Sequence, residues 1–164
     1  MFCVILISIW IQLNILNNIP LFGVKANIGI VLVVSLSILC GQAVGISVGI
    51  TYGILSDVLF GKAFGINTLL LFLTGFFCGK MSKGFSKENK TALIMVTIAA
   101  TVVIEVLTYL ILVVVYHYEM ALMTIVKTLV LEGIYHVFLT RIFFKGLSSL
   151  SETINKGKRS YYLL

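Results

Sequence analysis

The sequence has few charged residues. Only 11% of its 164 residues are charged and 60% are hydrophobic, whereas soluble domains have about 25% charged and roughly 45–50% apolar residues. Its apolar stretches are too long for buried strands and are apolar on all sides, unlike the one-sided helices of a soluble protein. The composition therefore excludes a soluble domain and predicts an all-α integral membrane protein.

Sequence patterns for catalysis, cofactors and metals are also missing. The chain has no HExxH, no glycine-rich phosphate loop with its lysine, no G-x-S-x-G and no close acid pair in a polar loop. Cys3, Cys40 and Cys78 are widely separated and form neither a CxxC pair nor a disulfide framework, so they are interpreted as packing residues. We expect a protein that is not an enzyme and has no catalytic, cofactor-binding or metal-binding residues.

The length of the chain allows five or six membrane spans. A transmembrane helix needs roughly 20 apolar residues to cross a bilayer core about 30 Å thick. The predicted spans are residues 2–16, 26–40, 41–60, 66–79, 91–118 and 120–144. They form one membrane domain, residues 1–144, with a tight turn at Cys40 and Gly41. Residues 145–164 follow as a basic tail that either lies on anionic lipid or is a flexible stop-transfer segment.

The formal net charge of +6 is interpreted as membrane topology. Basic residues crowd the connection 80–90 and the tail, without the interleaved aromatic residues that stack nucleic-acid bases, so no nucleic-acid partner is expected. The opposite loops carry only Lys25 and Lys62. By the positive-inside rule both basic clusters are cytoplasmic, and six spans then place the N-terminus in the cytoplasm as well.

A glycine stripe occupies the third predicted span. It consists of Gly41, Gly45, Gly49 and Gly53 in GQAVGISVGITYG. Residues four apart share one side of a helix, and glycine there lets another backbone approach, which is the main route to helix association in lipid. The stripe drifts by about 40° per step, so it suits several neighbours. Internal packing of the bundle is favoured over a surface for a partner protein.

The four-residue spacing continues to Asp57, Gly61 and Gly65. Asp57 thus lies near the outer end of the third span. An ionised acid in lipid is costly and is opposed by the dipole at a helix C-terminus, so Asp57 needs a cation, a hydrogen-bonded pocket or a proton. Lys127, in the outer half of the sixth span, is the best-placed cation.

An intramembrane polar network is predicted from Glu105, Lys127, Glu132 and His136. Glu105 and Glu132 lie at similar depth on antiparallel spans, and His136 is one turn from Glu132 on the same face. Together with Asp57 these residues are candidates for a proton or ion relay. A structural network that fixes helix register is favoured, because no run of ion-coordinating carboxylates and no pair of broken helices accompanies them.

Residues 53–67, GILSDVLFGKAFGIN, resemble the MreD family. That family has a Gly-apolar-x-x-Asp segment, then a short loop with two glycines, then an Asn that opens the next span. The matching residues are Gly53, Asp57, Gly61, Gly65 and Asn67. Gly75 and Gly79 lie where the family has a glycine-bearing span that leads into a basic cytoplasmic loop. The resemblance covers essentially the whole chain, although the spans beyond Gly79 match only in character.

The resemblance implies a non-enzymatic scaffold of the bacterial cell-elongation (rod-shape) complex in the cytoplasmic membrane. Its implied partners are MreC and, in the wider complex, MreB, RodA and its transpeptidase, which build lateral peptidoglycan. Membrane lipid is the other expected contact, and no small-molecule substrate is expected. The implied fold has six helices and is akin to the S-components of energy-coupling-factor vitamin importers. Such an S-component is the rival hypothesis, but the first span lacks the alanine pair that docks the coupling subunit in that class.

Overall fold

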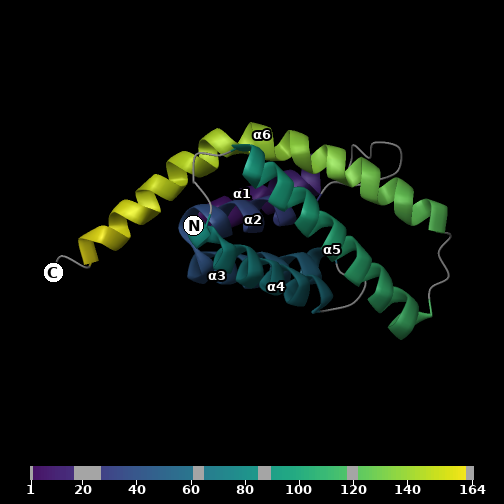
Figure 1. The fold of residues 1–164 in the computed structure, drawn as a ribbon. Coiled ribbons are helices and arrows are strands. Elements are labelled where there is room, and N and C mark those ends of the chain that lie inside the picture. The colour runs from purple at the N-terminus through teal and green to yellow at the C-terminus, as the bar shows by residue number, and fades with distance from the viewer. Residues whose placement is uncertain (1, 17–26, 61–64, 85–89, 118–121, 162–164) are drawn as a thin grey trace.

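The computed structural model describes residues 2–16, 27–60, 65–84, 90–117 and 122–161, and in these ranges it contains six α-helices and no strand (Figure 1). The all-α prediction is therefore confirmed for the described residues. The helices are α1 (Phe2–Ile11), α2 (Ile28–Cys40), α3 (Gln42–Phe60), α4 (Ile66–Met81), α5 (Lys90–Tyr116) and α6 (Leu122–Tyr161). A π-helical turn, η1 (Gln12–Leu16), continues α1, and a 3₁₀ turn, η2 (Ser82–Gly84), follows α4.

The helices fall close to the predicted spans, with two differences. The first span ends in the π-helical turn η1 rather than in a regular α-helix. The last helix does not end at Phe144 but continues to Tyr161, beyond the rest of the bundle (Figure 1). No proline interrupts this segment, so nothing in its backbone forces the helix to stop. The basic segment that was expected as a tail is therefore helical up to Tyr161.

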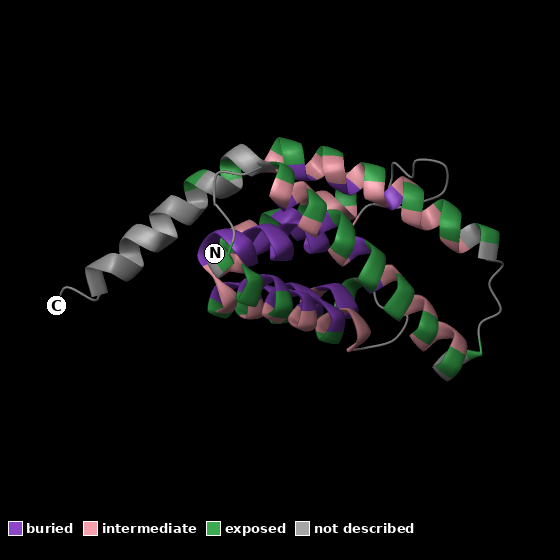
Figure 2. Cartoon of the chain, in the orientation of Figure 1, coloured by how far each residue is buried: buried purple, intermediate pink, exposed green. Residues whose placement is uncertain are grey.

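Helix α2 forms the centre of the molecule. All of its residues are buried, and it contacts each of the other five α-helices (Figure 2). Its sequence, IGIVLVVSLSILC, is apolar on nearly every side, which is the pattern of a helix enclosed by others. Its 13 residues reach only about 20 Å at 1.5 Å per residue, which is less than the thickness of a bilayer core. Helix α2 is too short to carry both of its ends to the membrane surfaces.

A single residue, Gly41, joins α2 to α3. Its backbone has a φ of 92° and a ψ of 177°, a combination that residues with a side chain avoid. Its N–H donates to the Ser37 carbonyl at 2.9 Å, and its carbonyl accepts from the Gly45 N–H at 3.1 Å. The tight turn predicted at Cys40 and Gly41 is present, and α3 begins directly where α2 ends.

Helices α3 and α4 pack with their backbones in contact. At most glycines of the stripe, an added Cβ atom would overlap atoms of α4. The close pairs are Gly45 with Gly75, Gly49 with Leu71, Gly53 with Thr68 and Gly79 with Gln42. Gly45 also faces the Ser37 side chain of α2, whereas an added Cβ atom at Gly41 meets nothing within 4 Å. The stripe therefore meets mainly one neighbour, α4, within the same chain.

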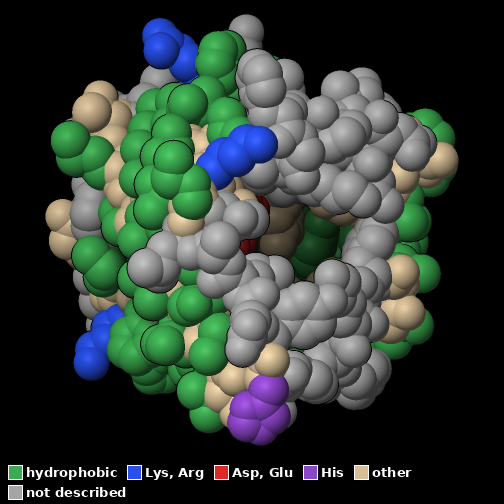
Figure 3. All heavy atoms as spheres, turned by 90° about the vertical axis from the view of Figure 1, so that its right-hand side faces the viewer, with side chains coloured by type: hydrophobic (Ala, Val, Ile, Leu, Met, Phe, Trp, Pro, Cys, Tyr) green, Lys and Arg blue, Asp and Glu red, His purple; other side chains and the backbone are tan. Residues whose placement is uncertain are grey.

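The outer surface of the molecule is apolar, whereas its interior contains polar side chains. Large hydrophobic side chains are exposed on every α-helix except α2, and they dominate the described surface in Figure 3. Apolar surfaces of this extent mark contact with a membrane or a partner. Within the described residues, two helices are long and apolar enough to cross a bilayer, through Gln42–Leu59 in α3 and Thr91–Val114 in α5. The count of six spans stays a prediction.

The contact between α3 and α4 predicts that Gly49→Ala destabilises the fold. In an open helix this change gains up to about 1 kcal/mol of helix propensity. At Gly49 the new methyl group would overlap the Leu71 carbonyl, and such overpacking costs about 1–3 kcal/mol. Gly133 in α6 has nothing within 4 Å of an added Cβ atom, so Gly133→Ala is the matched control.

Thermal unfolding in detergent should show a lower melting temperature for Gly49→Ala and an unchanged or higher one for Gly133→Ala. Equal melting temperatures for the two variants would contradict the close approach of α3 and α4.

Candidate functional site

Polar side chains gather at the N-termini of α4 and α2. The first backbone N–H groups of a helix have no partner within that helix. Lipid offers no acceptor, so a helix that begins inside a membrane protein needs acceptors from its own side chains or from neighbouring helices. These two helix ends account for most of the buried polar contacts described below.

Asp57 caps the N-terminus of α4 from the last turn of α3. Its carboxylate accepts hydrogen bonds from the backbone N–H groups of Gly65 at 3.0 Å, Asn67 at 3.1 Å and Thr68 at 2.9 Å, and from the Thr68 hydroxyl at 2.6 Å. Asp57 is buried. The N-terminus of a helix carries a partial positive charge, which stabilises a carboxylate. Of the three environments expected for Asp57, the structure contains the hydrogen-bonded pocket.

Two glycines make this cap possible. Gly53 lets the backbone of Thr68 approach α3, and Asp57 lies one turn further along the same helix face. Gly65 has a φ of 97° and a ψ of −17°, in the left-handed region that glycine occupies without strain. The segment that resembles the MreD family is therefore a helix-capping unit, except that Gly61 lies outside the described residues.

Lys127, which the sequence indicated as the best-placed cation, forms no ion pair with Asp57 among the described residues. Its side chain is exposed on α6, and among the described residues it has no ion-pair partner. The four hydrogen bonds at the start of α4 form the hydrogen-bonded pocket, one of the three environments that the sequence left open for Asp57. Among the described residues Lys127 also forms no ion pair with Glu105 or Glu132, with which it was grouped.

The buried N-terminus of α2 is satisfied by three side chains from different segments. The Asn27 side chain accepts the Gly29 N–H at 3.0 Å, and Gln12 of η1 accepts the Ile28 N–H at 3.0 Å through its Oε1 atom. The Asn27 N–H donates to Nε2 of His136 at 3.2 Å, and the Ile30 N–H reaches the Asn27 carbonyl at 3.3 Å. The N–H groups of residues 27–30 therefore all have acceptors.

His136 joins α6 to both α2 and α5. Because its Nε2 atom accepts the Asn27 N–H, the ring proton is assigned to Nδ1, which lies 2.7 Å from the Thr101 hydroxyl oxygen. The Thr101 hydroxyl in turn donates to the Thr97 carbonyl at 2.9 Å. The imidazole in this network is neutral. The Glu132 carboxyl oxygen, 3.6 Å from Nε2, is thus a polar neighbour rather than an ion-pair partner.

Glu105 and Glu132 form a carboxyl pair across α5 and α6. Their side chains are neighbours on these two facing helices. Glu132 is buried and Glu105 is half-buried. The polar contact that connects the two helices is that of His136 with the Thr101 hydroxyl.

The sequence interpretation missed several members of this network. Gln12, Asn27, Thr97 and Thr101 were not singled out. The spacing of the two threonines is the signal that could have found them. Helices α5 and α6 both carry polar residues four positions apart, and residues four apart share one helix face. The two sets are Thr97, Thr101 and Glu105 on α5, and Glu132, His136 and Thr140 on α6.

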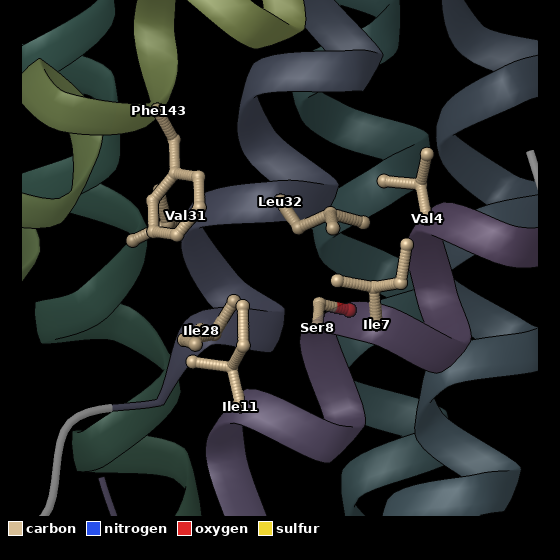
Figure 4. A pocket seen from close by; sticks show the side chains of 8 residues that line it. All are labelled: Val4, Ile7, Ser8, Ile11, Ile28, Val31, Leu32 and Phe143. Atoms are coloured by element: carbon tan, nitrogen blue, oxygen red, sulfur yellow. The ribbon is translucent and has the colours of Figure 1, made fainter. Parts of the chain in front are cut away.

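Two apolar cavities lie among the described residues. One of about 70 Å³ lies between α1, α2 and Phe143 of α6 (Figure 4). Its polar lining residue, Ser8, donates to the Ile5 carbonyl at 2.7 Å. A larger groove of about 310 Å³ runs between α4 and α5. No group of three or more potential metal ligands occurs in the part of the chain that the structure describes.

An apolar exterior around a short, capped central helix defines an all-helical membrane protein. The family model for the rod shape-determining protein MreD matches residues 1–150. The chain therefore belongs to the MreD family, as residues 53–67 indicated, and it is a rod shape-determining membrane protein. Comparisons with curated proteins and with solved structures give no match.

The cap on α4 predicts graded effects of substitutions at Asp57. Asp57→Leu removes every acceptor from the start of α4 and should lower the free energy of unfolding by about 2–4 kcal/mol. Asp57→Asn keeps one acceptor oxygen and should lower it by about 1–2 kcal/mol. Lys127→Gln should leave it within about 0.5 kcal/mol of the wild type. Denaturation in mixed detergent micelles gives this order, and a larger effect of Lys127→Gln than of Asp57→Asn would refute the cap.

The contacts of His136 predict that His136→Leu also destabilises the fold. Leucine leaves the Asn27 N–H without its acceptor, at about 1–3 kcal/mol for a buried group. It also removes the contact with the Thr101 oxygen, whose hydroxyl keeps its hydrogen bond to the Thr97 carbonyl. His117 is exposed and has a φ of 50°, which asparagine tolerates, so His117→Asn is the control.

Amide hydrogen exchange should become faster at Asn27 in His136→Leu and stay unchanged in His117→Asn. Unchanged protection of Asn27 in His136→Leu would show that the imidazole does not cap α2.

Proposed function

We propose that this chain is a non-enzymatic subunit of the bacterial cell-elongation complex that scaffolds MreC and the lateral peptidoglycan synthesis machinery. The observation that carries the proposal is that three buried or partly buried polar residues, Asp57, Asn27 and His136, are engaged as helix caps within the chain. Asp57 caps α4, while Asn27 and His136 cap α2. Side chains engaged in this way hold a shape, which is what a scaffold requires.

MreC is the proposed direct partner, and MreB, RodA and its transpeptidase belong to the wider complex. Membership of the MreD family supports this assignment. A partner recognises the exposed surface of a bundle, and that surface keeps its shape only if the helices keep their positions. The backbone contact between α3 and α4 and the enclosed helix α2 provide this rigidity, which lowers the entropic cost of binding.

The proposed location is the bacterial cytoplasmic membrane, crossed several times, with both termini in the cytoplasm. Residues 1–144 are the membrane domain and residues 145–164 the basic cytoplasmic segment. The end of α4, the start of α5 and the extension of α6 lie at one end of the molecule (Figure 1). These segments flank the basic connection 80–90 or contain the basic segment 145–164. A single cytoplasmic side therefore accommodates both basic clusters, as the positive-inside rule requires.

Affinity purification of the detergent-solubilised full chain from its native membrane tests the proposal, with mass spectrometry of the proteins that co-purify. Recovery of MreC with peptidoglycan synthesis proteins is the expected result. Recovery of an ABC-type ATPase pair with a transmembrane coupling subunit would instead identify an S-component of a vitamin importer and overturn the proposal.

In the same assay, Asp57→Leu should reduce the recovery of MreC, because loss of the cap displaces α4 and changes the surface that α3 and α4 present. Lys127→Gln alters an exposed side chain that has no role in the cap, so it should recover as much MreC as the wild type. Full recovery of MreC by Asp57→Leu would show that assembly of the complex does not depend on the cap.

A further inference from the structure

The groove between α4 and α5 is open and apolar. Leu70 and Ile104 are buried at its base, while Phe77 and Met81 are largely exposed along its α4 side. Thr74 also lines the groove, but its hydroxyl donates to the Leu70 carbonyl at 2.8 Å. The hydroxyl is therefore engaged within α4, and the lining suits an apolar chain. A volume of about 310 Å³ is at the lower end of the range of ligand-binding pockets.

A basic residue, Lys80, lies next to one end of this groove. Met81 lines the groove at the end of α4, and Lys80 beside it is exposed. The α5 side of the groove leads back to the N-terminus of α5, where a helix carries partial positive charge. The sequence that connects these two helices, residues 80–90, contains four lysines and one glutamate. An occupant with an apolar body and an anionic end would match both parts.

We propose that this groove binds an anionic phospholipid, with one acyl chain between α4 and α5 and the phosphate group near Lys80. The acyl chain would contact the apolar lining, while the phosphate would be attracted by Lys80 and the α5 N-terminus. Each basic residue near an anionic lipid strengthens its binding roughly fivefold. The proposal does not depend on binding of MreC.

The charge at the groove favours a lipid over a transmembrane helix of a partner protein. By the positive-inside rule, a partner helix would itself carry Lys or Arg at its cytoplasmic end. Those residues would then lie near Lys80, and like charges repel. An anionic phosphate at the same position is attracted instead. The bare apolar lining alone would accept either occupant, so the charge decides between them.

Native mass spectrometry of the purified full chain, titrated with phosphatidylglycerol or with phosphatidylcholine of the same acyl chains, tests this proposal. Phosphatidylglycerol should bind at least fivefold more tightly. Lys80→Gln should weaken the binding of phosphatidylglycerol roughly fivefold and leave the binding of phosphatidylcholine unchanged. Lys127→Gln, which removes an exposed lysine of α6 that does not line the groove, is the control and should change neither affinity. Equal affinities for the two lipids, or equal effects of the two substitutions, would overturn the proposal.

A second pair of variants tests the position of the acyl chain. Ala99 lines the groove and is exposed, so Ala99→Phe fills the groove without disturbing the core. Val102 is exposed on α5 outside the groove, which makes Val102→Phe the matched control. Ala99→Phe should reduce phosphatidylglycerol binding more than tenfold, and Val102→Phe should not. Unchanged phosphatidylglycerol binding by Ala99→Phe would show that the lipid binds elsewhere. If the purified protein retained a polyprenyl phosphate from the native membrane in place of a phospholipid, the proposed identity of the occupant would be wrong.

Discussion

The buried N-terminus of α2 is the constraint on which the rest of the structure depends. A helix end in the interior cannot give its N–H groups to water, and each one left without an acceptor costs about 1–3 kcal/mol. The acceptors come from Asn27 itself, from Gln12 in η1 and from His136 in α6. Segments at opposite ends of the sequence are thereby fixed around the central helix. Because α2 also contacts α3, α4 and α5, its position sets theirs.

The remaining helix contacts follow from the nature of lipid as a solvent. Apolar side chains gain little by leaving lipid for a helix interface, so specificity comes from close backbone packing and from polar contacts. Helices α3 and α4 use close backbone packing, through the glycine stripe. Asp57 then joins the end of α3 to the start of α4. Helices α5 and α6 use polar contacts, through the His136 ring and the Thr101 hydroxyl. The result is a bundle with an apolar exterior and a fixed shape.

The sequence predicted the class of fold and much of the α3 to α4 unit. Composition alone distinguishes a membrane protein from a soluble one. The spacing of Gly45, Gly49 and Gly53 can be read directly from the sequence, and in the structure these glycines contact α4. The environment of Asp57 was left open because three of its four hydrogen-bond donors are backbone N–H groups, which no sequence pattern marks. The bond between Asn27 and His136 spans 109 residues, so it depends on tertiary arrangement. The extension of α6 was missed because a change from apolar to polar composition does not by itself end a helix.

The measurement that bears most directly on this arrangement is the tautomeric state of His136 in a lipid bilayer. The chain has two histidines, so ¹⁵N-histidine labelling gives a simple spectrum, and His117→Asn assigns it. If the His136 ring caps α2, its Nδ1 atom carries the proton and its Nε2 atom has the chemical shift of an unprotonated nitrogen that accepts a hydrogen bond. A protonated Nε2 atom would contradict the cap on α2 and the arrangement of helices that depends on it.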